Sequence, residues 1–220
     1  MGQFLERLTS EFNAHRNTTI AEGQAAYLRN KFSFFGIKKP LLVSIEKTVF
    51  NTVSLDQPLE RVVRCMWQQD EREFQYVAYD LLMRHKRNWQ PELLALFAYM
   101  IRNKSWWDTV DMIAVNCVGG LLQQYSELIG TMDEWICDDN MWIRRTAILY
   151  QLKYKDKTDA KRLFSYCKLQ SGDTDFFIRK AIGWALRQYS KSNPETVRAF
   201  LAKCQKSLSP LSIREASKYI

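Results

Sequence analysis

The chain has 220 residues, of which 46% are hydrophobic and 25% charged, and these ordinary proportions exclude a long disordered tail. The 32 lysines and arginines outnumber the 24 aspartates and glutamates, and the resulting net charge of +8 favours a polyanionic partner such as nucleic acid. Uncharged apolar runs are shorter than the roughly 20 residues that cross a bilayer, and the start of the chain lacks a secretory pattern, so we expect no membrane association and a cytoplasmic protein, cytosolic or nucleoid-associated.

Hydrophobic periodicity predicts helices along nearly the whole chain and no strands. All five prolines open runs of helix formers, as expected at the first turn of a helix. Short connections and a recurrence of helix pairs about every 30–40 residues predict one all-α solenoid of helical repeats over residues 1–220, whose concave side could form a basic surface that fits a DNA duplex. The predicted helices cover residues 3–15, 19–32, 40–50, 58–67, 71–84, 91–102, 106–122, 126–137, 140–153, 158–168, 174–189, 194–205 and 210–219.

Two early segments define the first part of the chain. Residues 31–39, which include three phenylalanines and Gly36, break the helical periodicity and predict a bulky turn. In 71–84 the apolar residues recur at three and four positions, which predicts an amphipathic helix with Glu73 and Asp80 on the face opposite the core. That apolar face is made of Phe74, Val77, Ala78, Leu81 and Leu82.

The segment Ser105–Asp111, at the start of the helix predicted over 106–122, combines two tryptophans with two acids. Ser105 and Asp108 have the spacing of a capping box, which predicts that they cap the helix. Trp107 precedes Asp111 by four residues, so both side chains project from one face and could form a site. The alternative is structural: acids favour the first turn of a helix, and tryptophans anchor cores. We expect Trp106 to be in the core and Trp107 to face a groove.

Two later helices carry basic residues. In 140–153, Arg144 and Arg145 are adjacent, and at least one is expected to reach solvent or phosphate, although pairing with a carboxylate fits the sequence equally well. In 174–189, Lys180, Trp184 and Arg187 share one face, which suits a nucleic-acid surface. A tryptophan packed between helices beside two cations is the commoner arrangement of such residues. Gly183 is expected to permit close helix packing.

Metal and histidine chemistry have little to build on in this sequence. The only histidines are His15 and His85, far apart in the chain, and no two cysteines form a C-x-x-C pair. We therefore expect neither a zinc site, nor a Ser-His-Asp triad, nor a disulfide framework. The cysteines, which lie in apolar helical contexts, are Cys65, Cys117, Cys137, Cys167 and Cys204.

Long ordered runs of the sequence closely resemble the AlkD-type DNA alkylation repair enzymes. These runs are Asn103 to Asp111, Ala147 to Lys155 and Phe176 to Tyr189. Arg72–Gln75 and Pro210–Ala216 fit the same family, so the resemblance covers nearly the whole chain. Motifs of this length are far less exposed to chance matches than short expressions are.

The resemblance implies a HEAT-like solenoid that hydrolyses the N-glycosidic bond of cationic N3- and N7-alkylated purines, such as 3-methyladenine and 7-methylguanine, in double-stranded DNA during base excision repair. It implies Asp111 as the catalytic carboxylate, Trp107 and Trp184 as the tryptophans of the cleft, and Arg145 as a phosphate contact. A tyrosine on the family's second helix matches Tyr27. No metal or cofactor is implied, and a monomer suits a solenoid that wraps a duplex. Lys180 and Arg187 join the expected DNA contacts because of their spacing.

Two other functions fit the composition. A helical scaffold could bind DNA through its basic charge without catalysis, and Asp111 is the residue that discriminates this function from a glycosylase. A helical adaptor could instead bind proteins and keep its aromatic residues in the core. The salt dependence of DNA binding would separate the adaptor from both DNA-binding functions.

Overall fold

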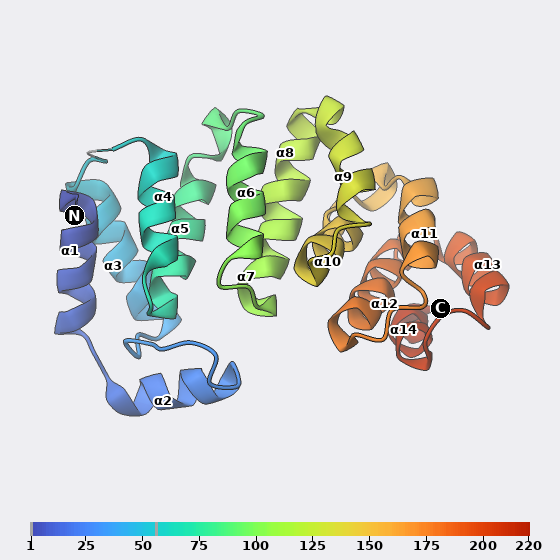
Figure 1. The fold of residues 1–220 in the computed structure, drawn as a ribbon, viewed down its shortest axis with the longest axis horizontal. Coiled ribbons are helices and arrows are strands. Elements are labelled where there is room, and N and C mark those ends of the chain that lie inside the picture. The colour runs from blue at the N-terminus through green and yellow to red at the C-terminus, as the bar shows by residue number, and fades with distance from the viewer. Residues whose placement is uncertain (1, 56) are drawn as a thin grey trace. The chain divides into compact units, whose positions relative to one another are not determined.

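A computed structural model describes residues 2–55 and 57–220, and these residues form helices joined by short turns (Figure 1). No β-strand occurs within the described residues, where Ser33 and Glu71 form only an isolated bridge. The all-α prediction is therefore confirmed. The chain divides into two compact units, Met1–Trp89 and Gln90–Ile220.

The described residues of the first unit form five α-helices, and α2 lies across the ends of the others (Figure 1). α2 ends earlier than the prediction over 19–32, because Arg29 (φ 58°) and Asn30 (φ 56°) take the left-handed conformation that ends a helix. α2 also buries none of its residues. The helices are α1 (Gln3–Ala14), α2 (Thr18–Tyr27), α3 (Lys39–Thr52), α4 (Leu59–Gln68) and α5 (Arg72–Arg84), followed by the 3-10 turn η1 (Lys86–Asn88).

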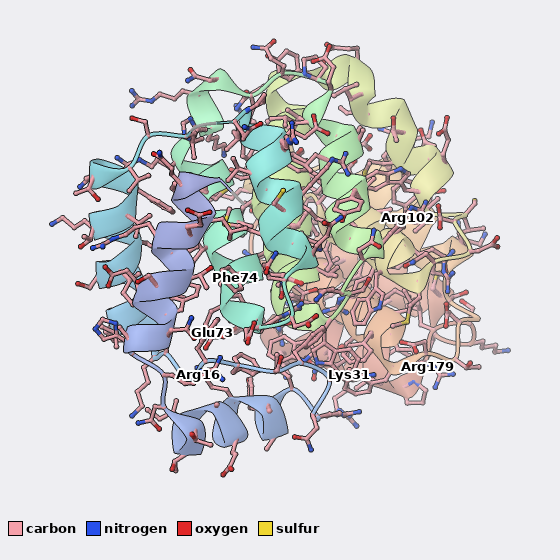
Figure 2. All side chains as sticks on the ribbon, turned by 60° about the vertical axis from the view of Figure 1, so that its left-hand side comes forward. Arg16, Lys31, Glu73, Phe74, Arg102 and Arg179 are labelled. Carbon is pink, nitrogen blue, oxygen red and sulfur yellow. The ribbon has the colours of Figure 1, made fainter. Side chains whose placement is uncertain are left out.

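The apolar face predicted for α5 is confirmed, since all five of its predicted core residues are buried. The prediction for Glu73 is wrong, because this side chain is fully buried and points toward the loop that follows α2 (Figure 2). Its carboxylate accepts hydrogen bonds from the backbone amides of Phe35 (3.1 Å), Gly36 (2.9 Å) and Ile37 (3.1 Å). Periodicity could not show this role, because the bulky turn supplies the partners from another part of the chain.

The second unit continues with helices in which α10 packs against α12 and α12 packs against α14. One prediction, a continuous helix over 106–122, is realised as three joined segments: α7, the π-helix η2 and α8. The elements are α6 (Leu93–Arg102), α7 (Trp107–Met112), η2 (Ile113–Val118), α8 (Gly119–Gln124), η3 (Ser126–Ile129), α9 (Gly130–Trp135), α10 (Met141–Leu149), η4 (Lys155–Lys157), α11 (Ala160–Leu169), α12 (Phe176–Ser190), α13 (Pro194–Cys204), α14 (Pro210–Ala216) and η5 (Ser217–Tyr219).

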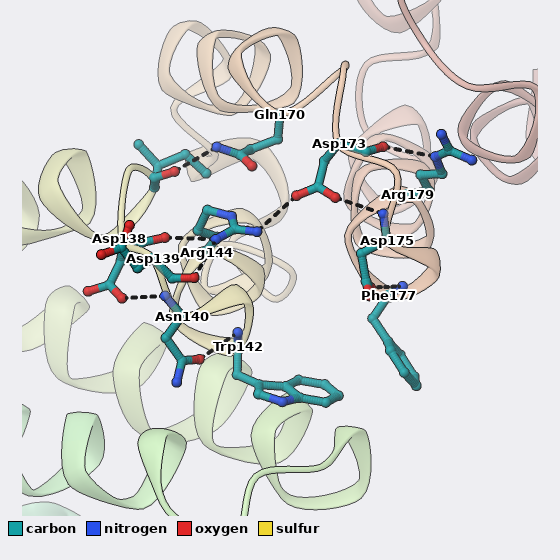
Figure 3. Close-up of polar contacts among 11 residues, drawn as sticks. Asp138, Asp139, Asn140, Trp142, Arg144, Gln170, Asp173, Asp175, Phe177 and Arg179 are labelled. Carbon is teal, nitrogen blue, oxygen red and sulfur yellow. Dashed lines mark hydrogen bonds and ion pairs between the residues drawn. The ribbon is translucent and has the colours of Figure 1, made fainter.

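A repeated capping pattern starts both α10 and α12. Asn140 accepts a hydrogen bond from the Trp142 amide (2.9 Å), and Asp175 accepts one from the Phe177 amide (2.6 Å). Arg144 joins the two starts by donating to the carbonyl oxygen of Asp138 (2.8 Å) and the carboxylate of Asp173 (2.9 Å), as Figure 3 shows. Arg144 thus follows the carboxylate-pairing alternative, and the repeats position α10 and α12 side by side.

The cysteines form no disulfides, as the sequence predicts. All five cysteines are free; Cys117, Cys167 and Cys204 are buried, whereas Cys65 and Cys137 are exposed. In the part of the chain that the structure describes, no helix has the length and apolarity needed to cross a bilayer.

Candidate functional site

The site begins where α7 passes into the π-helix η2. Gly119, just after η2, lies so close to α10 that a Cβ there would come within 2.2 Å of the Tyr150 carbonyl oxygen. The Tyr154 hydroxyl donates a hydrogen bond to the Gly119 carbonyl (2.8 Å), which fixes this contact. Inside the wide turn, the Asn116 side-chain amide donates to the Met112 carbonyl (3.1 Å). A π-helical turn shifts the side chains that follow it around the helix and is frequent at functional sites.

Asp111, one turn into α7, forms a two-pronged ion pair with Arg145 of α10. Arg145 donates from Nε to Asp111 Oδ1 (2.7 Å) and from Nη2 to Asp111 Oδ2 (2.8 Å). Its third nitrogen, Nη1, donates to the Phe177 carbonyl oxygen. Arg145 is 4% exposed, and the Asp111 side chain is 16% exposed. Such parallel bonds fix both carboxylate oxygens in one orientation.

An aromatic cluster adjoins this ion pair through Phe177, whose ring centroid lies 5.8 Å from the Arg145 guanidinium. Trp106 packs edge-on against Trp142, with ring centroids 5.7 Å apart, and against Phe177 at 5.1 Å. Trp106 is buried, which confirms its predicted place in the core. The capping box is wrong: Trp106 is the residue that precedes α7, and the Ser105 hydroxyl donates back to the Ile101 carbonyl (2.5 Å). The Ser105 hydroxyl therefore bonds to the end of the preceding helix, α6, instead of capping the start of α7.

Asp111 and Trp184 line one cleft of about 330 Å³. The cleft therefore brings together an acid of α7 and a tryptophan of α12, two residues that the sequence analysis placed in one site. Lys153 and Asn116 also line it, and the Lys153 ammonium donates to the side-chain oxygen Oδ1 of Asn116 (2.6 Å). Sequence reasoning missed both, because only the π-turn places Asn116 beside Lys153. The remaining lining residues are Met112, Val115, Leu152 and Gln188.

Lys180 and Arg187 are held by an acid that the sequence analysis did not single out. Glu215 of α14 pairs with Lys180 (3.0 Å) through Oε1 and with Arg187 (2.9 Å) and Lys218 (3.0 Å) through Oε2. Burial alone would raise the pKa of Glu215, but hydrogen bonds from Lys218 and Lys180 and their charges outweigh it and lower the pKa to about 2. The Glu215 carboxylate thus forms ion pairs with two cations of α12 and one of η5.

Close packing of α12 on α14 makes this cation group possible. A Cβ at Gly183 would lie 2.5 Å from the Glu215 Cβ and 2.9 Å from the Ser212 carbonyl oxygen. The expectation that Gly183 permits close packing is therefore confirmed.

Two other predicted site residues, Trp107 and Tyr27, are not among the residues that line this cleft. Trp107 is half-buried at the first position of α7, one turn before Asp111. Tyr27 belongs to the first unit, where it is 72% exposed and lines a cleft of about 450 Å³ with Phe34 and Tyr76. Among the described residues, no group of three or more histidine, cysteine, aspartate or glutamate side chains could hold a metal ion.

Comparisons with known proteins give the family. The family model described as DNA alkylation repair enzyme matches residues 8–220. The chain belongs to this family. The solved structure of a predicted DNA alkylation repair enzyme from Enterococcus faecalis is 33% identical in sequence, with a TM-score of 0.85 over 94% of this chain and 97% of that one. No curated protein matches the chain.

More distant structures share the fold of this DNA alkylation repair family member. AlkD2 from Streptococcus mutans is 20% identical, with a TM-score of 0.63 over 91% of this chain and 99% of that one. Smu.31 from Streptococcus mutans UA159 is 18% identical, with a TM-score of 0.62 over 81% of this chain and 91% of that one. These two likenesses concern the helical repeat architecture alone.

Proposed function

We propose that the protein is a DNA glycosylase that hydrolyses the N-glycosidic bond of cationic N3- and N7-alkylated purines in duplex DNA. The observation that carries the proposal is the Asp111 carboxylate, which is oriented by Arg145 at the wall of a cleft that it shares with Trp184. Membership of the DNA alkylation repair family supports DNA as the substrate.

The chemistry needs few catalytic groups because the substrate is already activated. Alkylation at N3 or N7 makes the purine cationic, so it departs as a neutral base when the C1′–N9 bond breaks and the electron pair moves to the base. Positive charge then develops on the deoxyribose, where a fixed carboxylate stabilises it. Asp111 provides that charge and orients the water that adds to C1′. The water proton passes to Asp111 or solvent, and a free base and an abasic site remain.

The tryptophans give the cleft its preference for cationic nucleotides. Trp184 lines the cleft beside Asp111. An aromatic face attracts a cation by about 0.5–2 kcal/mol, depending on desolvation. Trp107, one turn before Asp111 on α7, extends the aromatic surface in this proposal. The apolar residues Val115 and Leu152 suit contact with a sugar or the edge of a base.

The DNA backbone is bound by the basic residues of the chain, whose net charge is +8. Lys180 and Arg187, held by Glu215, are assigned to phosphate contacts, and Tyr27 of the first unit is assigned to the substrate strand. Arg145 was expected to contact phosphate, but its three nitrogens donate to Asp111 and Phe177. The proposal therefore makes Arg145 the residue that positions Asp111. We further propose that the protein is a monomer and acts in the cytoplasm, in base excision repair.

A base-release assay tests this function directly. Wild-type protein incubated with a 7-methylguanine duplex should release free 7-methylguanine, and Asp111→Asn should lose about 100-fold or more of this activity while still binding the duplex. Asp108→Asn, on the same helix, removes an acid that does not line the cleft and should retain most activity. A folded wild-type protein that releases no base would overturn the proposal.

A DNA-binding protein without catalysis is the second candidate. One observation favours it: both oxygens of Asp111 already accept hydrogen bonds from Arg145, as in a structural ion pair. In that case the wild-type protein would bind duplex DNA and release no base, and Asp111→Asn would alter its stability alone.

A further inference from the structure

Asn116 and Lys153 line the same cleft as Asp111 and Trp184, and their side chains are joined by a hydrogen bond. We infer that Lys153, positioned by Asn116, binds a phosphate of the DNA backbone next to the alkylated nucleotide. The inference rests on the proposed function, because it assumes that Asp111 and Trp184 receive that nucleotide.

Arg145 and Lys153 differ in how available each is to an anion. Arg145 is buried, and its three nitrogens are engaged by Asp111 and the Phe177 carbonyl. Lys153 lines the same cleft from an exposed position, and within the described residues its ammonium meets no carboxylate within salt-bridge distance. Lys153 therefore keeps an uncompensated positive charge at the place where a nucleotide would bind.

Lys153 has a long flexible side chain, which Asn116 holds in place. Its ammonium donates to the Asn116 carbonyl oxygen (2.6 Å), and the amide nitrogen of Asn116 donates to the Met112 carbonyl (3.1 Å). Met112 ends α7, one residue after Asp111, and Asn116 lies in the π-helix η2. One short chain of hydrogen bonds therefore links the phosphate-binding lysine to the helix that carries the acid.

Lys153 differs from Lys180 and Arg187 in the charge of its partner. A neutral amide holds Lys153 without cancelling its charge, whereas the carboxylate of Glu215 offsets part of the charge of Lys180 and Arg187. An ammonium has three donors, so Lys153 can bond to Asn116 and to a phosphate oxygen together. The cleft then presents a carboxylate for the sugar and an ammonium for the adjoining phosphate, which matches the order of charges along a nucleotide.

The salt dependence of duplex binding tests the role of Lys153. Binding of an abasic-analogue duplex is measured by fluorescence anisotropy between about 50 and 300 mM salt, where each phosphate contact contributes a slope of about 0.9 in log K against log salt. Lys153→Gln should lower the slope by about 1 and weaken binding several-fold at physiological salt. Lys161→Gln is the matched control, because Lys161 is an exposed lysine of α11 that does not line the cleft.

Variants of Asn116 separate a positioning role from a merely structural one. Asn116→Asp should lower the salt slope about as much as Lys153→Gln, because the new carboxylate pairs with the ammonium. Asn116→Ala should retain most of the slope and reduce kcat/KM for base release several-fold. In a Lys153→Gln background, Asn116→Ala should have little further effect, since the residue it positions is gone.

The outcomes distinguish this inference from the proposed function. If Lys153→Gln keeps the wild-type salt slope, or Lys161→Gln loses as much, the role of Lys153 is overturned even when the wild type releases base. If Lys153→Gln loses slope but the wild type releases no base, the phosphate contact stands and the glycosylase proposal fails. A wild type that does not bind duplex DNA at low salt overturns both.

Discussion

Asp111 and Glu215 are two carboxylates of the second unit that are both held by cations, but with different charge balance. Asp111 meets one arginine, and the pair is neutral and lies at the wall of a cleft. Glu215 meets three cations, Lys180, Arg187 and Lys218, so its group is positive. The same kind of ion pair thus serves two purposes in the proposed function: one presents an acid to the nucleotide, and the other arranges cations toward the DNA backbone.

Removing Arg145 should have the largest effect on activity and stability, because it leaves Asp111 without the arginine that pairs with it. Arg145→Met leaves the Asp111 carboxylate partly buried and misoriented, and we expect base release to fall roughly 100-fold. Breaking such a pair from one side should also cost about 3 kcal/mol in the free energy of unfolding. Base release and urea unfolding measure the two effects.

A double variant shows which of the two effects belongs to function. Arg145→Met combined with Asp111→Leu replaces the pair by apolar side chains, which is often close to neutral for stability. The double variant should therefore recover most of the lost free energy of unfolding and none of the base release. If it recovered activity, Asp111 would not be the catalytic acid. If it stayed as unstable as the single variant, an unpaired charge would not explain the instability.

The sequence was sufficient for much of the fold because periodicity and proline positions act locally. The helices around Phe74 and after Pro194 lie where the pattern predicts them. One error occurs where a distant partner decides the outcome: Glu73 is buried because the loop at Phe35–Ile37 offers it backbone amides. The other error is a local competition, because the Ser105 hydroxyl donates to the Ile101 carbonyl, four residues earlier, instead of capping α7.

The candidate site shows the same limit. Spacing on one helix could place Trp107 near Asp111, but it could not place Arg145, from another helix, on Asp111. The sequence did not identify Glu215 or Asn116 as site residues, because each contacts its lysine only in the folded chain. Glu215 pairs with Lys180, and Asn116 accepts a hydrogen bond from Lys153. These side-chain pairs join different helices, so they depend on how α7, α10, α12 and α14 pack. A local sequence pattern does not predict that packing.

The next largest effect is expected at Gly183, which sharpens the comparison by disturbing Glu215 without touching Asp111. In Gly183→Ala, the methyl group would clash with Glu215 and the Ser212 carbonyl, so α14 must shift away from α12. We expect a loss of about 1–3 kcal/mol in the free energy of unfolding and a lower salt slope for duplex binding.

Gly130 provides the matched control for Gly183. It starts α9 with helical backbone angles and has open space around its Cβ position. Gly130→Ala should therefore be neutral or stabilising by about 0.4–1 kcal/mol. Equal stability of the two variants would show that α12 and α14 can separate freely, and the role given to Gly183 would fail.

The smallest effect is expected in the pH dependence of stability through Glu215. Its pKa is lowered to about 2 in the folded chain, below its ordinary value of about 4.3. A lowered acid pKa contributes stability above the unfolded value, and this contribution is lost as the pH falls toward 2. The difference in unfolding free energy between wild type and Glu215→Gln should thus be constant above about pH 5 and shrink below it. Glu195→Gln, which removes an exposed acid paired with Arg198, is the control for the loss of one negative charge. A wild-type advantage over Glu215→Gln that persists unchanged in acid would mean that the three cations do not hold Glu215 in its charged form, and the contrast with Asp111 would lose its electrostatic basis.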